Sequence, residues 1–189
     1  MEAARVTTLA DFVAFEDASP TKHELVNGVI VAMAGASMRH NAIAMNIGAA
    51  LHLQLRAGDC RPYSSDQRVH VLRTDLDTYP DVVVICGAPI LSPDDRHAVT
   101  NPTLLVEVLS PSTERYDRGA KWLHYQQLPT LREYLLVASE GEPTIERFFR
   151  GDDGGWRYDV VRGEAAVMKL ASCAASLSID DAYAKAPAE

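Results

Sequence analysis

Apolar runs bounded by turn residues divide the chain into short elements. Residues 79–87 contain an unbroken run of β-branched residues, and a second run lies between Pro102 and Ser110. Runs of this length, rich in Val, Leu and Thr, are typical of strands covered on both faces. Residues 133–138 have the same character. We therefore expect three buried strands here.

Elsewhere in the chain, the spacing of apolar residues distinguishes expected helices from expected strands. Asn27-Gly28 between two apolar segments favours a two-residue hairpin turn, and Thr8 and Ser37 are suitable helix N-caps. The expected helices are residues 9–15, 37–57 and 111–127, with a helical turn at 180–183. The remaining expected strands are residues 23–26, 29–34, 61–64, 66–72, 144–150, 156–162 and 175–179. Residues 73–78 and 88–101 are expected to be polar loops.

The order of these elements predicts an α/β fold. The run before Ser110, the helix after it and the strand at 133–138 form a strand–helix–strand unit, whose two strands are expected to be parallel neighbours. We expect a mixed β-sheet flanked by helices, with an extra N-terminal hairpin and a C-terminal hairpin at residues 144–162. With 189 residues, 47% hydrophobic and 23% charged, the chain is expected to form a single domain over 1–189, with a core of about residues 20–150.

The net charge of the chain limits how it could bind nucleic acid. The formal net charge of −8 repels nucleic acid as a whole, so a polyanion would be bound through a local basic patch or a metal. A metal-dependent nuclease remains compatible with this charge, because acidic ligands are what gather the metal.

The cysteines and the apolar segments bear on the cellular compartment of the protein. Cys60, Cys86 and Cys173 are scattered and contain no Cys-x-x-Cys pair, so we expect neither a zinc site nor a disulfide, and we interpret Cys86 as a small buried hydrophobe. Residues 1–6 lack the pattern of a signal peptide, and no apolar run approaches the ~18 residues of a membrane span. We expect a cytoplasmic protein.

One acid lies inside an expected buried strand. Burying a lone carboxylate costs several kcal/mol, so Glu107 needs a partner. Asp81 stands at the mouth of the other apolar strand. If these strands are neighbours, the two carboxylates can converge on a hard divalent cation such as Mg²⁺, with water filling the remaining positions. Spacing alone leaves the alternative open that the acids are unrelated.

These residues resemble a known family. The residues that carry the resemblance are Pro80-Asp81, the stretch Val106-Glu107-Val108-Leu109-Ser110-Pro111-Ser112-Thr113, the Asp117, Lys121 and Tyr125 stripe, Glu133-Tyr134, the Glu24-Leu25-Val26-Asn27-Gly28 hairpin and His40. In these residues the chain is similar to the Uma-type family of proposed restriction endonucleases, a branch of the PD-(D/E)xK nuclease superfamily. The likeness covers about residues 20–150. It implies a restriction-endonuclease-like core, hydrolysis of phosphodiesters, and a metal held by Asp81, Glu107 and the Val108 carbonyl.

The chain departs from the superfamily at one place. The superfamily's lysine lies two residues after the Glu, where this chain has Leu109. The resemblance assigns its role, orienting water or stabilising charge, to Lys121 on the following helix. The alternative is a surface ion pair between Lys121 and Asp117 at i, i+4, worth about 0.2–0.5 kcal/mol.

Several other residues are candidates for the site or its surroundings. Glu24 is a candidate additional metal ligand or a solvated acid before a turn, and His40 is a candidate site residue or a structural histidine. Gln67 is predicted to lie on the strand beside Asp81 and to face the same cleft. Tyr125 is interpreted as a packing residue with a satisfied hydroxyl. Four arginines are candidates for a local basic rim, with solvated charged helix faces as the alternative: Arg39, Arg115, Arg118 and Arg132.

Taken together, the sequence predicts a Mg²⁺- or Mn²⁺-dependent endonuclease acting on DNA, with Asp81, Glu107 and Lys121 as catalytic residues. A catalytically inactive nucleic-acid-binding or regulatory module that keeps the fold is the alternative, and a metal hydrolase of a smaller phosphoester is a third. A homodimer would cut both strands of a duplex, although no residue pattern points to one.

Overall fold

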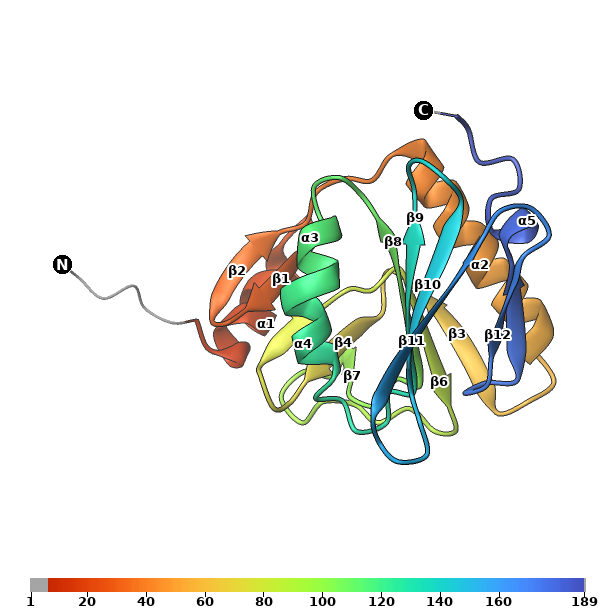
Figure 1. The fold of residues 1–189 in the computed structure, drawn as a ribbon. Helices are drawn as coiled ribbons and strands as arrows, with labels where there is room; N and C mark the ends of the chain where they lie inside the picture. Colours follow the sequence, from red (N-terminus) through yellow and green to blue (C-terminus); the bar gives the residue numbers. More distant parts are fainter. Residues whose placement is uncertain (1–6, 189) are drawn as a thin grey trace.

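The computed structural model describes residues 7–188 (Figure 1). Its helical segments are α1 (Leu9–Ala18), α2 (Met38–Leu55), α3 (Glu114–Tyr116), the π-helical turn η1 (Asp117–Lys121), α4 (Trp122–Tyr125) and α5 (Ile179–Ala182). Its strands are β1 (His23–Val26), β2 (Val29–Ala32), β3 (Cys60–Ser64), β4 (Arg68–Val71), β5 (Leu76–Thr78), β6 (Val82–Cys86), β7 (Ala98–Val99), β8 (Leu104–Leu109), β9 (Glu133–Ala138), β10 (Thr144–Arg150), β11 (Trp156–Arg162), β12 (Val167–Leu170) and β13 (Ala175–Ser178).

The larger sheet has the strand order β11-β10-β9-β8-β6-β3. Strands β8 and β9 are parallel, whereas the other neighbours pair antiparallel. The parallel pair is joined through the helical segments α3, η1 and α4, which confirms the predicted strand–helix–strand unit. The mixed α/β architecture agrees with the expected fold class. Strand β8, which carries Glu107, is therefore central, and β6 is its neighbour.

Each face of the larger sheet has its own hydrophobic cluster. On one face, α2 packs four buried residues spaced one turn apart: Ile43, Ile47, Leu51 and Leu55. On the other face, Leu105 and Leu109 of β8 contact Trp122 and Tyr125 of the α4 helix. Because alternate residues of a strand point to opposite faces, Glu107 lies on the α4 side. Each large aliphatic side chain buried here contributes about 1.5–3 kcal/mol.

The smaller sheet has the order β2-β1-β5-β4-β7. The predicted N-terminal hairpin forms two of its strands and turns at Asn27-Gly28, whose φ angles of 50° and 75° match the expected hairpin turn. The expectation of loops throughout 73–78 and 88–101 is wrong, because β5 and β7 lie there. These strands of three and two residues are too short for periodicity to reveal them.

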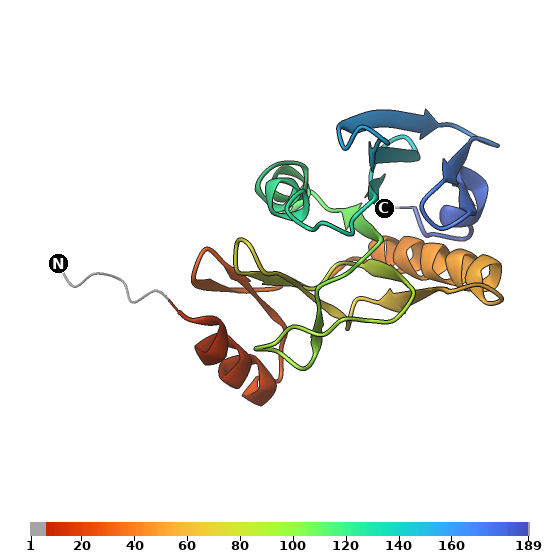
Figure 2. The same cartoon turned by 90° about the horizontal axis from the view of Figure 1, so that it is seen from below.

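The two ends of the described chain lie on opposite sides of the molecule. Figures 1 and 2 show α1 and the β1–β2 hairpin on one side, and the β12–β13 hairpin with α5 on the other. Strand β12 was not expected, whereas β13 and α5 agree with the prediction for the tail. Among the residues with described positions, no helix is both long and apolar enough to cross a bilayer.

The expectation that the cysteines form no disulfide is wrong. Cys60 of β3 lies opposite Cys86 of β6 in the antiparallel register, and their sulfurs are bonded. The spacing of 26 residues contains no sign of this pairing, which follows from the register of two strands. Cys173 is free and buried. The prediction about a signal peptide concerns residues 1–6, which lie outside the described part of the chain.

Candidate active site

Asp81 and Glu107 come from neighbouring strands. In the antiparallel pairing of β6 with β8, Val82 lies opposite Val106. One step further outward, the same register places Asp81 opposite Glu107. Asp81 directly precedes β6, and its Oδ2 atom accepts the backbone N–H of Val108, the residue after Glu107, at 2.7 Å. The structure thus brings together two acids that are far apart along the chain.

Glu107 is held by two donors from the following helix. The Lys121 Nζ atom lies 2.9 Å from Glu107 Oε1, and the Tyr125 hydroxyl donates to the same oxygen at 2.8 Å. Glu107 and Lys121 are only 5% and 4% exposed. Burial raises the pKa of Glu107 to about 8, although the nearby ammonium acts in the opposite direction. Tyr125 is therefore both a packing residue and a direct partner of Glu107.

Lys121 contacts two further acids. Its Nζ atom lies 3.0 Å from Glu24 Oε1 and 3.6 Å from Asp117 Oδ1. Burial by itself lowers the pKa of Lys121, but the charges of Glu107, Glu24 and Asp117 raise it well above its ordinary value. Burial also raises the pKa of Asp117. The interpretation of Lys121–Asp117 as a surface pair is wrong, since both side chains are buried. We call these four residues the Lys121 cluster.

The position of Glu24 excludes the solvated alternative. Glu24 is 7% exposed, and the Thr78 hydroxyl of β5 donates to its Oε1 atom. Thr78 was missed by the sequence reasoning because it fell in an expected loop. Its hydroxyl holds the carboxylate that in turn contacts Lys121.

His40 contacts the other acid. Its Nε2 atom lies 3.2 Å from Asp81 Oδ2, and the same oxygen accepts the Val108 backbone N–H at 2.7 Å. Burial lowers the pKa of His40, but the hydrogen bond and charge of Asp81 outweigh it, so the net shift is upward. Ser37 accepts the His40 backbone N–H at the start of α2. The predicted N-cap thus positions a residue of the site.

Access from solvent differs within the site. The side chains of Asp81 and His40 are 16% and 12% exposed, whereas those of Glu107 and Lys121 are 6% and 5% exposed. A ligand would therefore reach the site from the side of Asp81 and His40, with the Lys121 cluster beneath.

The site contains carboxylate oxygens, the type of ligand that a hard divalent cation prefers. Four carboxylates, Asp81 and the three of the Lys121 cluster, face one ammonium and one imidazole. The closest contacts of Asp81 and Glu107 fall on Oδ2 and Oε1, which leaves the second oxygens for a cation. Within residues 7–188, no three His, Cys, Asp or Glu side chains form a ready-made coordination sphere. Mg²⁺ commonly takes only one or two carboxylates and keeps several waters.

The prediction for Gln67 is wrong. Its Nε2 atom donates to the backbone carbonyls of Arg68 and His97, 3.0 and 2.9 Å away, in the smaller sheet. The strand that follows it, β4, pairs with β5 and β7 and not with β6. The amide of Gln67 therefore connects two segments of the smaller sheet, which is a structural task.

The four arginines of the predicted basic rim have different surroundings. Arg39 donates to the backbone carbonyls of Ser139 and Pro187, and Arg118 is paired with two acids. Arg115 and Arg132 are exposed, and neither makes an ion pair with any described residue. Arg132 precedes β9 and Arg115 follows β8, so they lie toward opposite ends of this parallel pair. No continuous rim forms among the described residues.

The helix that carries Lys121 is interrupted. Residues 117–121 form a π-helical turn, and the Tyr134 hydroxyl donates to the Asp117 carbonyl at 3.2 Å. Single π turns within helices recur at functional sites. The helical period alone predicted that Asp117, Lys121 and Tyr125 share one side, and all three are buried there.

Several known proteins are similar to this chain in sequence or in fold. Residues 9–180 match the sequence profile of the Uma2 family, described as "Putative restriction endonuclease". Two similar proteins come from Synechocystis sp. (strain ATCC 27184 / PCC 6803 / Kazusa). The "Uncharacterized protein slr1290" is 36% identical to this chain, and the alignment covers 92% of this chain and 89% of that protein. The "Uncharacterized protein sll1609" is 31% identical, with coverage of 88% of this chain and 93% of that protein. The fold is similar to that of "a putative nuclease belonging to DUF820" from Anabaena variabilis ATCC 29413, with a TM-score of 0.70, 18% identity, and coverage of 87% of this chain and 91% of that one. The chain therefore belongs to the Uma2 family.

Proposed function

We propose that the protein is an endonuclease that hydrolyses phosphodiester bonds in DNA and depends on Mg²⁺ or Mn²⁺. The observation that carries the proposal is the meeting of Asp81 and Glu107 on neighbouring strands, with the Lys121 ammonium 2.9 Å from Glu107. The family is described as "Putative restriction endonuclease" and the structural neighbour as "a putative nuclease", and both descriptions support the same chemistry.

Asp81 and Glu107 are the residues that would hold the cation. A bound divalent cation supplies Lewis acidity for the phosphoryl oxygen and lowers the pKa of coordinated water. Val108 holds Asp81 in place through its backbone N–H, and Tyr125 does the same for Glu107 through its hydroxyl. The carboxylates are therefore oriented before a cation arrives.

Lys121 would supply the positive charge that the reaction needs. Hydrolysis of a phosphodiester adds negative charge to the phosphoryl oxygens in the transition state, and a fixed ammonium in a site of low polarity stabilises it. Glu24 and Asp117 keep Lys121 protonated and limit its movement. In this proposal, Lys121 on the helix takes the role of the superfamily's strand lysine, because this chain has Leu109 at the strand position.

Burial of the cluster favours a second candidate function. Glu107 and Lys121 are almost sealed from solvent, and the side chains of Asp81 and His40 are more exposed than theirs. A protein that keeps the fold and binds nucleic acid without turnover would show the same arrangement. This second candidate is a nucleic-acid-binding or regulatory module.

Plasmid cleavage separates the two candidates. We expect the wild-type protein to nick supercoiled plasmid with Mg²⁺ or Mn²⁺, and Asp81→Ala and Glu107→Ala each to abolish nicking, because either change removes a carboxylate of the cation site. The matched control is Asp94→Ala, which removes an exposed acid outside the site and should cleave as the wild type does.

A metal titration by calorimetry accompanies the cleavage assay. Mn²⁺ should bind the wild type and Asp94→Ala but not Asp81→Ala. Wild-type protein that binds labelled DNA and leaves every plasmid intact in both metals would favour the module. Metal binding that is equal in Asp81→Ala and the wild type would overturn the proposed cation site.

A further inference from the structure

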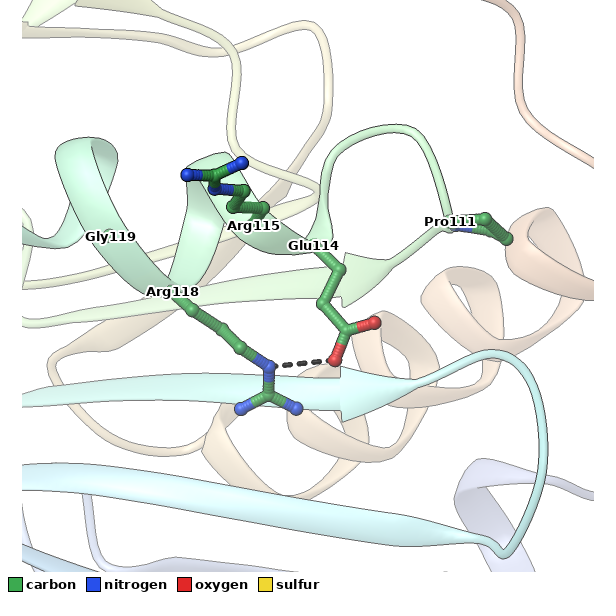
Figure 3. A pocket seen from close by; sticks show the side chains of 5 residues that line it. All are labelled: Pro111, Glu114, Arg115, Arg118 and Gly119. Atoms are coloured by element: carbon green, nitrogen blue, oxygen red, sulfur yellow. Dashed lines mark hydrogen bonds and ion pairs between the residues drawn. The ribbon is translucent and has the colours of Figure 1, made fainter.

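An open depression lies on the outer face of the helix that carries Lys121. Its volume is about 430 Å³. It is lined by the five residues labelled in Figure 3: Pro111, Glu114, Arg115, Arg118 and Gly119. Asp117 and Lys121 lie on the same helix but are buried. Pro111 follows the end of β8, so this outer depression begins at the end of the strand that carries Glu107.

Gly119 leaves space that the described chain does not fill. A Cβ atom built at this position would meet no atom within 4 Å, and the φ angle is not in the left-handed region. Glycine in a helix is less stable than alanine because it loses more conformational freedom on folding. Neither packing nor backbone conformation thus requires glycine here. A residue without a side chain suits close approach of a ligand to the helix.

Arg115 is the available charge of the outer depression. Arg118 is bound to Glu114 at 2.8 Å and to Glu146 at 2.6 Å. Figure 3 shows the guanidinium of Arg115 directed away from the Glu114–Arg118 pair. Among residues 7–188, Arg115 makes no ion pair or hydrogen bond through its side chain. Because the two acids offset Arg118, the free cation at the outer depression is Arg115.

We propose that the outer depression receives the sugar–phosphate backbone of a DNA duplex, with the Arg115 guanidinium contacting one phosphate and Gly119 allowing close approach. The partner is identified by chemistry, since a planar guanidinium forms two parallel hydrogen bonds to a phosphate. The inference rests on the proposed function and extends it from the cleaved bond to the binding of the flanking backbone. A local cation of this kind is one way in which a chain of net charge −8 can hold a polyanion.

Binding and cleavage are measured separately to test this. Fluorescence anisotropy of a short fluorescein-labelled DNA duplex, with Ca²⁺ in place of Mg²⁺, gives Kd from about 50 to about 200 mM salt. Arg115→Ala should weaken binding several-fold and reduce the slope of log K against log salt by about 0.9, the value for one phosphate contact. Gly119→Leu should also weaken binding while its Tm does not fall, because the added side chain fills open space.

Arg132→Ala is the matched control, since it removes an exposed arginine near the other end of the β8–β9 pair. It should keep the wild-type affinity and salt slope. The inference is overturned if Arg115→Ala and Gly119→Leu bind and cleave as Arg132→Ala does, and the proposed endonuclease then still stands. Wild-type protein that neither binds nor cleaves DNA would overturn the endonuclease and the backbone contact together.

Discussion

Two acid–base pairs lie three residues apart along the same helix. They have the same sequence spacing but differ in burial and in contact distance. Glu114–Arg118 and Asp117–Lys121 are both i, i+4 pairs. The first has side chains 49% and 36% exposed and a contact of 2.8 Å, whereas the second has side chains 4% and 5% exposed and a contact of 3.6 Å. The exposed pair is thus the shorter of the two.

The burial of each pair indicates its energetic importance better than its contact distance does. An exposed ion pair is screened by water and salt and contributes about 0–1 kcal/mol. In the Lys121 cluster, one ammonium faces three carboxylates that water cannot solvate, so its removal leaves uncompensated buried charge. The helix therefore presents a weakly coupled surface pair on its outer face and a strongly coupled group on its inner face.

The largest expected effect comes from removing the buried ammonium. Lys121→Met keeps much of the side-chain volume but leaves Glu24, Glu107 and Asp117 without their shared cation. We expect the free energy of unfolding to fall by about 3–5 kcal/mol, measured by urea denaturation, and plasmid nicking to stop. Arg115→Met, which removes an exposed cation from the same helix, should change stability by less than about 0.5 kcal/mol. Equal losses in the two variants would contradict the ranking by burial.

Asp77 sharpens the comparison because it is a buried acid without a hydrogen-bond partner. It is 0% exposed, and neither oxygen has a partner among the described residues. Burial, together with the charge of Asp95, raises the pKa of Asp77 to about 8. Between its ordinary pKa and about 8, the folded state keeps a proton that the unfolded chain releases. Stability should therefore fall as pH rises through this window, by at most about 1.4 kcal/mol per unit.

Asp77→Asn removes the titrating group at almost the same volume. We expect its Tm to exceed that of the wild type by a margin that grows from pH 5 to pH 8, measured by thermal unfolding across that range. The exposed acid Asp94, changed to Asn, serves as the control and should show no such trend. A margin that is constant with pH would show that Asp77 is ionised in the folded state.

The smallest effect is expected on the outer face. Glu114→Gln breaks the exposed pair but leaves Arg118 bound to Glu146. We expect a loss of about 0.2–0.5 kcal/mol at low salt, which should disappear at high salt because screening removes what the pair contributes. Denaturation at two ionic strengths measures this. A loss comparable with that of Lys121→Met would contradict the assignment of Glu114 to the surface.

Several elements could be read from local pattern because local physics forms them. Thr8 and Asp11 make a reciprocal capping box at the start of α1, and Ser37 caps α2. The Asn27-Gly28 turn needs two positive φ angles, which these residue types tolerate best. The Asp81 and Glu107 strands were visible as apolar runs, and the isolated acid within one of them pointed to a site.

Other features depended on segments that meet only after folding. Gln67 was assigned to the wrong sheet because an alternating strand does not reveal its neighbours. The partners Cys60 and Cys86 are set by the β3–β6 register, and the hydroxyl of Thr78 reaches Glu24 across two short strands. No periodicity within a few residues encodes such contacts.

The order of residues was sufficient for the α/β class, the strand carrying Glu107, the strand that follows Asp81 and the helix carrying Lys121, since hydrophobic period and capping act over a few residues. That these two strands are neighbours was decided by the folded sheet. Which acids share the Lys121 ammonium, and how deeply they are buried, followed from the packing of the smaller sheet and the helix against the larger sheet. Ion pairing and the cost of removing charge from water depend on distances across the folded chain, and these are set when the layers close on one another.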